Sequence, residues 1–119
     1  MKNSLIVILF FTQLSFSQKN EFLNREFWKS NPSIEEVNRK IKSGNDPTEL
    51  NRFGFDALGY ALLEKTNNKT LKYLLTLKGN DVNKLTHDAR TYVFWAAYKD
   101  NIDFVNHLIS NGADMNIVD

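Results

Sequence analysis

Apolar residues recur at three- and four-residue spacing in several short stretches of the chain, and polar residues fill the positions between them. In "IDFVNHLISNG", for example, Ile102, Val105, Leu108 and Ile109 fall on one face of a helix, and mostly polar residues fall on the other. This period predicts an amphipathic α-helix that buries one stripe of side chains. The C-terminal part of the chain is therefore expected to be helical.

Two earlier stretches show the same period. The stripe consists of Leu71, Leu74 and Leu75 in "TLKYLLTLKG" and of Ile34, Val37 and Ile41 in "SIEEVNRKIKSG". Ser33 and Glu36 have the spacing of a capping box at the start of the latter helix. Each of the three helices leads into a glycine (Gly44, Gly79 or Gly112), which predicts a left-handed residue that ends the helix.

A shorter apolar segment precedes each of these helices, at residues 20–29, 56–65 and 91–100. Asp56 and Thr91 begin the last two segments and are expected to cap them. The repeating unit is thus turn, helix, loop, helix. Gly79 and Gly112 lie 33 positions apart, as repeat units of this kind do. One unit cannot bury its own stripe, so the units are expected to stack.

The chain resembles the ankyrin-repeat family. The matching positions are Thr91, Val93, Ala96, Ala97, Val105, Leu108, Ile109 and Gly112-Ala113-Asp114-Met115-Asn116 in the third unit, and Gly54, Leu58, Ala61, Leu74, Leu75 and Gly79-Asn80-Asp81-Val82-Asn83 in the second. The resemblance implies an all-α helix-turn-helix solenoid of about three repeats. The domain would span residues 18–119, with units at about 20–50, 51–85 and 86–119.

Two features depart from the family pattern. The T-P-L-H tetrapeptide reads Asp56-Ala57-Leu58-Gly59 in the second unit and Thr91-Tyr92-Val93-Phe94 in the third, so no histidine is expected to link neighbouring loops. The second unit is also two residues longer, since Gly44 and Gly79 are 35 positions apart. We place this excess in "KTNNKT", between the two helices of that unit.

The first 17 residues have the pattern of a secretory signal peptide. Lys2 is basic, residues 5–11 are apolar, and Ser15 and Ser17 suit cleavage after Ser17. The apolar run is far shorter than the roughly 20 residues of a membrane-spanning helix. We expect a protein of the bacterial envelope, periplasmic or secreted, without a membrane association after cleavage.

Composition narrows the range of partners. The chain has 15 basic and 14 acidic side chains and no cysteine. Removal of Lys2 with the signal peptide leaves no net charge, and the two signs are interspersed along the sequence. Binding to nucleic acid depends on a surplus of Lys and Arg that neutralises phosphates. Nucleic acid is therefore not expected as a partner, and disulfides are excluded.

The sequence offers little for catalysis. The two histidines, His87 and His107, lack metal-ligand spacing, and we expect both to be exposed and unpaired. Glu35 and Glu36 fall in the first turn of a helix, where their negative charges interact favourably with the helix dipole. "NKT" at residues 68–70 matches a glycan acceptor pattern that is common by chance. The sequence therefore predicts no enzyme, no metal site and no cofactor.

The family resemblance instead implies a protein-binding surface formed by the turn tips and the outward faces of the first helices. Transferred to this chain, the candidate partner-binding residues are Arg52, Phe53, Phe55, Leu63, Glu64, His87, Asp88, Arg90, Tyr98 and Lys99. Phe53 and Phe55 either stay exposed for binding or fold back onto the first helices. Trp95 is expected in the core beside Ala96, with no binding role.

The function predicted from this surface is an exported module that binds an unknown protein partner. One alternative is an envelope inhibitor or immunity-type protein that neutralises one enzyme or toxin. Another, of a different class, is a small ligand-binding or hydrolytic domain. The end of the sequence resembles a junction to a further unit. A fragment of a longer array is slightly favoured over a frayed end or a face for self-association.

Overall fold

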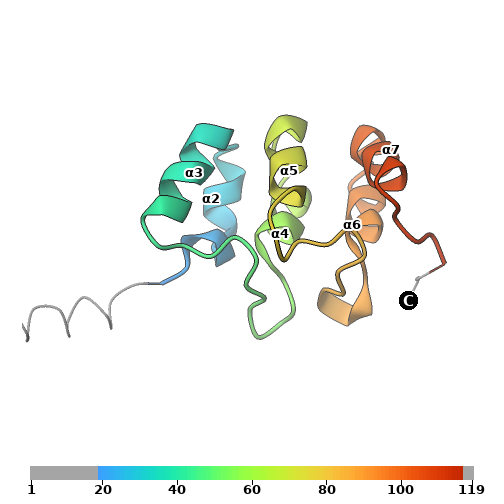
Figure 1. The fold of residues 1–119 in the computed structure, drawn as a ribbon, viewed down its shortest axis with the longest axis horizontal. Coiled ribbons are helices and arrows are strands. Elements are labelled where there is room, and N and C mark those ends of the chain that lie inside the picture. The colour runs from blue at the N-terminus through green and yellow to red at the C-terminus, as the bar shows by residue number, and fades with distance from the viewer. Residues whose placement is uncertain (1–18, 117–119) are drawn as a thin grey trace, which may run out of the picture.

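The computed structural model describes residues 19–116, so the predicted signal peptide lies outside the described residues. Three helix pairs lie side by side along the long axis (Figure 1). The pairs are α2 (Arg25–Lys29) with α3 (Ile34–Lys42), α4 (Ala57–Leu63) with α5 (Asn68–Leu75), and α6 (Tyr92–Tyr98) with α7 (Ile102–Ser110). Two 3-10 turns, η1 (Glu21–Leu23) and η2 (His87–Ala89), precede α2 and α6. Residues 19–116 contain no strand, and the predicted all-α class is confirmed.

The helices form two rows. In the first row α4 packs between α2 and α6, and in the second row α5 packs between α3 and α7. The buried side chains come from both rows and form one cluster, whose largest members are Trp28, Tyr92, Phe22, Phe104, Leu58, Leu62, Leu71, Leu74 and Leu108. Each helix pair therefore contributes apolar area to a core that runs through the stack, as stacked repeats require. The loops before α4 and α6 extend to the same side, at the bottom of Figure 1.

The predicted N-terminal caps are partly confirmed. The Ser33 hydroxyl accepts from the Glu36 amide, and the Glu36 carboxylate accepts from the Ser33 amide, which completes the capping box. The Asp56 side chain caps α4 by accepting from the Gly59 amide at 2.8 Å. The prediction for Thr91 is wrong, because its hydroxyl makes no capping hydrogen bond. The amide of Phe94 donates to the Thr91 carbonyl oxygen instead, at 3.1 Å.

The glycine stops are also only partly as predicted. Gly44 and Gly112 have positive φ, and the amides around them close the last turns of α3 and α7. Gly79 also has positive φ, but α5 already ends at Leu75, with Thr76 as its C-cap. The extra length of the second unit is thus divided. Asn67, the N-cap of α5, is 34 positions after Ser33, and Gly79 lies 12 positions after Asn67, whereas Gly44 lies 11 positions after Ser33.

The first predicted helix, at residues 20–29, is interrupted. Asn24 has extended backbone angles, and its side chain accepts from the Glu26 amide as the N-cap of α2. The Asn20 side chain likewise accepts from the Phe22 amide at the start of η1. Asparagine side chains compete with the helix for backbone amides, which explains two short elements in place of one helix.

The buried face of α7 also differs from the predicted stripe. Phe104 and Leu108 are fully buried, whereas Ile102 is 57% exposed and Ile109 is 46% exposed. The reason is that α5 and α6 cover α7 on the side that carries Phe104 and Leu108. The other side of the predicted stripe has no neighbouring element among residues 19–116. Across the same residues, no helix has the length and apolar character needed to span a bilayer.

Candidate partner-binding groove

An open groove of about 470 Å³ lies along the turns and the first-row helices. It is lined by Arg25, Phe55, Leu63, His87, Asp88, Arg90, Phe94, Trp95, Tyr98 and Lys99. Seven of these belong to the predicted partner-binding set, so the structure places most of that set on one surface. Arg52, Phe53 and Glu64 lie outside the lining. Arg25 and Phe94 were not predicted from the sequence as lining residues, and Trp95 was predicted in the core with no binding role.

Aromatic rings form the wall of the groove. Phe55 is half-buried and stacks on Tyr60, with ring centres 5.0 Å apart, and on His87, with ring centres 4.7 Å apart. Its ring centre also lies 5.3 Å from that of Trp95. Phe55 has thus folded back onto the first helices, whereas Phe53 stays 56% exposed. The guanidinium of Arg52 lies over the Phe53 ring, 4.7 Å from its centre.

The prediction that His87 is unpaired is wrong, although its side chain stays 38% exposed. Its Nδ1 lies 2.6 Å from the carbonyl oxygen of Phe53. Because a carbonyl oxygen only accepts, Nδ1 carries the hydrogen. This bond joins the turns of the second and third units, so a turn-tip histidine links neighbouring loops even though the T-P-L-H histidine is absent. His107 is half-buried as well, and its ring stacks on Phe104 with centres 5.7 Å apart.

Trp95 is buried, as predicted, but it also lines the groove. Its indole Nε1 donates to the hydroxyl of Thr86 at 2.8 Å, which fixes the ring orientation. The rings of Phe94, which precedes it in α6, and of Tyr98, which follows it, have centres 5.0 and 6.3 Å from that of Trp95. Phe94 and Tyr98 are four residues apart, one turn of a helix, and this spacing was the available signal that they share a face.

The charged side chains of the groove differ in whether they are paired. Arg25 Nη2 forms an ion pair with Glu64 Oε2 at 2.5 Å. Asp88 Oδ2 lies 3.5 Å from His87 Nε2. The guanidinium carbon of Arg90 lies 3.7 Å from the centre of the Phe94 ring, and its Nε is buried with no hydrogen-bond partner.

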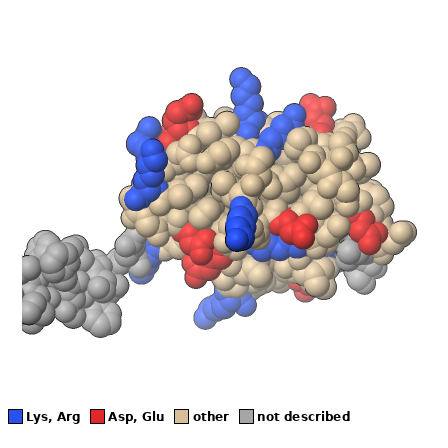
Figure 2. All heavy atoms as spheres, in the orientation of Figure 1, with Lys and Arg blue, Asp and Glu red and all other residues tan. Residues whose placement is uncertain are grey.

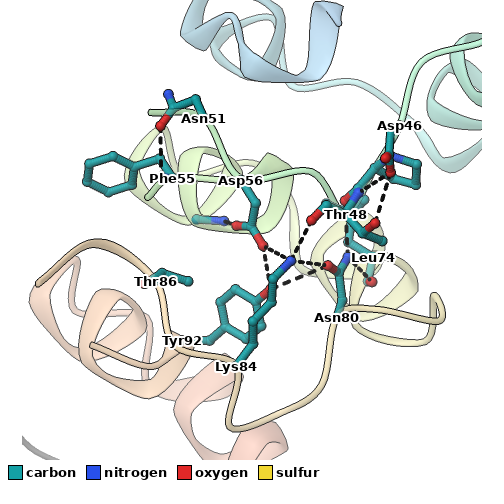
Figure 3. Close-up of polar contacts among 12 residues, drawn as sticks. Asp46, Thr48, Asn51, Phe55, Asp56, Leu74, Asn80, Lys84, Thr86 and Tyr92 are labelled. Carbon is teal, nitrogen blue, oxygen red and sulfur yellow. Dashed lines mark hydrogen bonds and ion pairs between the residues drawn. The ribbon is translucent and has the colours of Figure 1, made fainter. Parts of the chain in front are cut away.

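A buried polar network holds the second and third units together (Figure 3). The Asp56 carboxylate is fully buried. Its Oδ2 accepts from the Tyr92 hydroxyl at 2.6 Å and pairs with Lys84 Nζ at 2.8 Å. Lys84 Nζ also donates to the Thr48 carbonyl at 2.7 Å and to Asn80 Oδ1 at 3.1 Å. Almost every polar atom of this cluster therefore has a partner, as a buried network requires.

This network perturbs one titratable group. Burial, and secondarily the negative charge and hydrogen bonding of Asp56, raise the pKa of Tyr92 far above its ordinary value of about 10. The phenol therefore stays protonated and remains a hydrogen-bond donor to Asp56. Tyr92 starts α6, so the same bond positions the helix that carries Phe94, Trp95 and Tyr98.

Other candidate sites are absent from residues 19–116 or already have structural roles. No group of three or more His, Asp or Glu side chains in this range could hold a metal ion. In the glycan acceptor pattern, Asn68 Oδ1 accepts from Asn101 at 2.8 Å and Thr70 is fully buried, with its hydroxyl donating to the Pro32 carbonyl. Those two residues are therefore part of the packing between units.

Comparison with known proteins gives one family assignment. A search of curated proteins finds no match for the chain. The family model for ankyrin repeats, in three copies, matches residues 29–119, which is more than half of the chain. The matched residues include all of α3 to α7, and the three helix pairs have the arrangement expected for three stacked units. The chain therefore belongs to the ankyrin-repeat family.

Proposed function

We propose that this protein is an exported interaction module that binds a protein partner in the groove of the turn tips and first-row helices. Ankyrin repeats are generally protein–protein interaction modules, and the family is typically non-enzymatic. The proposal adds a particular surface and a location, the periplasm or the extracellular space. The groove lies on the surface that the family resemblance assigns to partners.

The observation that carries the proposal is the composition of the groove. Aromatic rings from two turns and from α6 converge there, beside Arg90. Aromatic and arginine side chains account for most of the binding free energy at protein interfaces, at about 2 kcal/mol or more for each dominant residue. Tyr98 is 67% exposed, so a partner would bury a large part of its ring. The exposed Tyr98 ring adjoins the half-buried ring of Phe94, and exposed apolar surface of this kind is typical of a binding site.

The hydrolytic alternative has less support. His87 is the histidine of the groove lining, but its Nδ1 is bonded to the Phe53 carbonyl and its ring is stacked on Phe55. A general base needs to reach a nucleophile or a water in an enclosed site. Here the neighbouring Tyr98 and Asp88 are largely open to solvent, at 67% for Tyr98 as a whole and 68% for the Asp88 side chain. This open geometry favours the binding of a partner protein over hydrolysis.

The binding proposal is tested with the full chain, tagged at its C-terminus and recovered from the cell envelope with its associated proteins. A Phe94→Ala, Tyr98→Ala variant changes the groove, and a Lys69→Ala, Lys72→Ala variant changes exposed positions of α5 as a matched control. Both variants must keep the helicity and thermal midpoint of the parent. We expect the groove variant to lose a partner that the control retains. A partner retained by both variants would contradict the groove as the binding site.

Export is tested separately by sequencing the N-terminus of the protein recovered from the envelope. We expect the chain to begin at Gln18, because Ser15 and Ser17 suit a signal peptidase. A chain that still begins at Met1 and stays in the cytoplasm would contradict the proposed location. That result would leave the binding proposal intact, since the groove is formed by residues after Asn24.

A further inference from the structure

We propose that the groove recognises an acidic peptide segment of its partner, in which an aspartate or glutamate lies beside an apolar side chain. This inference rests on the proposed function, because it names the chemistry that the same groove would bind. It is carried by the position of one arginine, by the charges around it and by the exposed ring next to it.

Arg90 is held as a preformed anion-binding group. Its backbone lies at the base of the turn, where its carbonyl accepts from the Thr86 amide at 2.9 Å and its amide donates to the His87 carbonyl at 3.2 Å. Its guanidinium carbon lies 3.7 Å from the centre of the Phe94 ring. A planar guanidinium stacked on a ring keeps its in-plane N–H groups for hydrogen bonds with a carboxylate. Little side-chain freedom would be lost on binding.

The charges around Arg90 leave a positive surplus. Among residues 19–116, neither Arg90 nor Lys99 forms an ion pair, whereas the third cation of the groove, Arg25, is paired with Glu64 at 2.5 Å. Asp88 is the acidic residue of the lining, and it lies against His87. The Nε of Arg90 is also buried with no hydrogen-bond partner. A carboxylate from outside would supply the missing charge, whereas the buried Nε lies out of its reach in this conformation.

The apolar part of the proposed segment follows from Tyr98. Its ring stacks on Phe94, with centres 6.1 Å apart, and it is 67% exposed. The Phe94 ring therefore contacts both the Arg90 guanidinium and the Tyr98 ring. A ligand whose carboxylate reaches Arg90 would place its neighbouring side chain against the Tyr98 ring. An aromatic or aliphatic side chain would bury that ring, and a polar one would not.

A peptide is favoured over a nucleic acid because the cations are few and local. Lys and Arg side chains are interspersed with Asp and Glu on the surface in Figure 2, and the whole chain has 15 basic and 14 acidic residues. A phosphate backbone needs a continuous series of cations, one for each phosphate that it contacts. Two unpaired cations beside one exposed ring suit one or two carboxylates and a neighbouring apolar side chain.

The test is a selection of short random peptides, displayed on phage, against the full chain. The enriched sequence is then synthesised with a fluorescent label, together with a counterpart in which each Asp or Glu is the corresponding amide. Fluorescence anisotropy measures both against the parent, Arg90→Gln, Arg90→Lys and Lys72→Gln. Lys72→Gln is the matched control, since it removes one positive charge from an exposed position of α5. The variants are compared at equal helicity and thermal midpoint.

We expect the enriched peptides to pair an acidic with an apolar residue, and the amide counterpart to bind the parent about tenfold more weakly. Arg90→Gln should abolish this difference, Arg90→Lys should restore part of it, and Lys72→Gln should leave it unchanged. Enriched neutral or basic peptides that lose affinity in a Tyr98→Ala variant would overturn this inference and leave the proposed function standing. Acidic peptides that bind Arg90→Gln as tightly as the parent would also overturn it. Failure of any peptide to enrich would count against both.

Discussion

Replacement of Lys84 by methionine tests how much the buried network around Asp56 stabilises the fold. Methionine keeps most of the side-chain volume and removes the ammonium group, so the Asp56 carboxylate loses its counter-ion. That carboxylate is fully buried, and the Lys84 side chain is only 14% exposed. Removal of one partner from a buried ion pair typically costs about 3–5 kcal/mol of stability. Asp56 would keep its bonds from Tyr92 and Gly59, which favours the lower end, about 3 kcal/mol.

A loss of this size is easy to measure, because a domain of this length has a total stability of about 5–15 kcal/mol. It corresponds to a fall in thermal midpoint of about 12–24 °C. The double variant Asp56→Asn, Lys84→Met is the control. Its asparagine can still cap α4, and its amide can donate to Tyr92, so no unpaired charge is buried. We expect the double variant to recover most of the lost stability.

The assay is urea unfolding at neutral pH, followed by circular dichroism, for the parent, both single variants and the double variant. A lower midpoint with an unchanged m value would show a stability effect without a change in the extent of unfolding. The double-mutant cycle then gives the coupling between Asp56 and Lys84. A Lys84→Met loss below about 1 kcal/mol, the value of an exposed pair, would refute the argument that this pair is buried.

Three further predictions concern other local features. Thr91→Val should raise the unfolding free energy by about 1 kcal/mol in the same urea assay, because the Thr91 hydroxyl is buried without a partner; a destabilised variant would contradict this. Neutral Tyr92 should contribute its full stabilisation at pH values below its ordinary pKa of about 10, and this contribution should fall as the pH rises above that value. The difference in unfolding free energy between the parent and Tyr92→Phe should therefore shrink at high pH. Gly54→Ala should cost about 2 kcal/mol or more, since φ is +86° and a Cβ would lie 3.1 Å from the His87 backbone. Gly112→Ala, with φ of +92° and no atom within 4 Å of a Cβ, should cost about 1 kcal/mol, and equal losses would show that the His87 contact is unimportant.

The features that the sequence predicted depend on residues close together in the chain. The helix pairs follow from a three- and four-residue period, and the capping box needs only Ser33 and Glu36. The Asp56 cap joins residues three positions apart. Such signals act within one unit and can be read without knowing how the units stack. Together with the 33-residue spacing of Gly79 and Gly112, they sufficed to predict the all-α class and the family.

Several features that the sequence did not predict join residues in different units. His87 and Phe53 are 34 positions apart, and Tyr92 and Asp56 are 36 positions apart. The partner of His87 is a backbone carbonyl, which leaves no trace in the identity of a side chain. These contacts depend on the register in which one unit stacks on the next. The exposed or buried state of a turn residue is therefore decided by its neighbour unit.

The contrast between Asp56 and Thr91, at equivalent positions of two units, connects the stacking of the units with the groove. In the second unit the side chain that caps the first helix is Asp56, and its other carboxylate oxygen accepts from the Tyr92 hydroxyl of the third unit. At the equivalent position of the third unit, Thr91 neither caps nor links. A threonine hydroxyl at position 56 could cap α4, but it could not also balance the charge of Lys84. Aspartate thus replaces the family threonine where one side chain must cap a helix, neutralise a buried cation and position α6. Since α6 carries the rings beside Arg90, the geometry of the groove depends on a carboxylate that lies outside its lining.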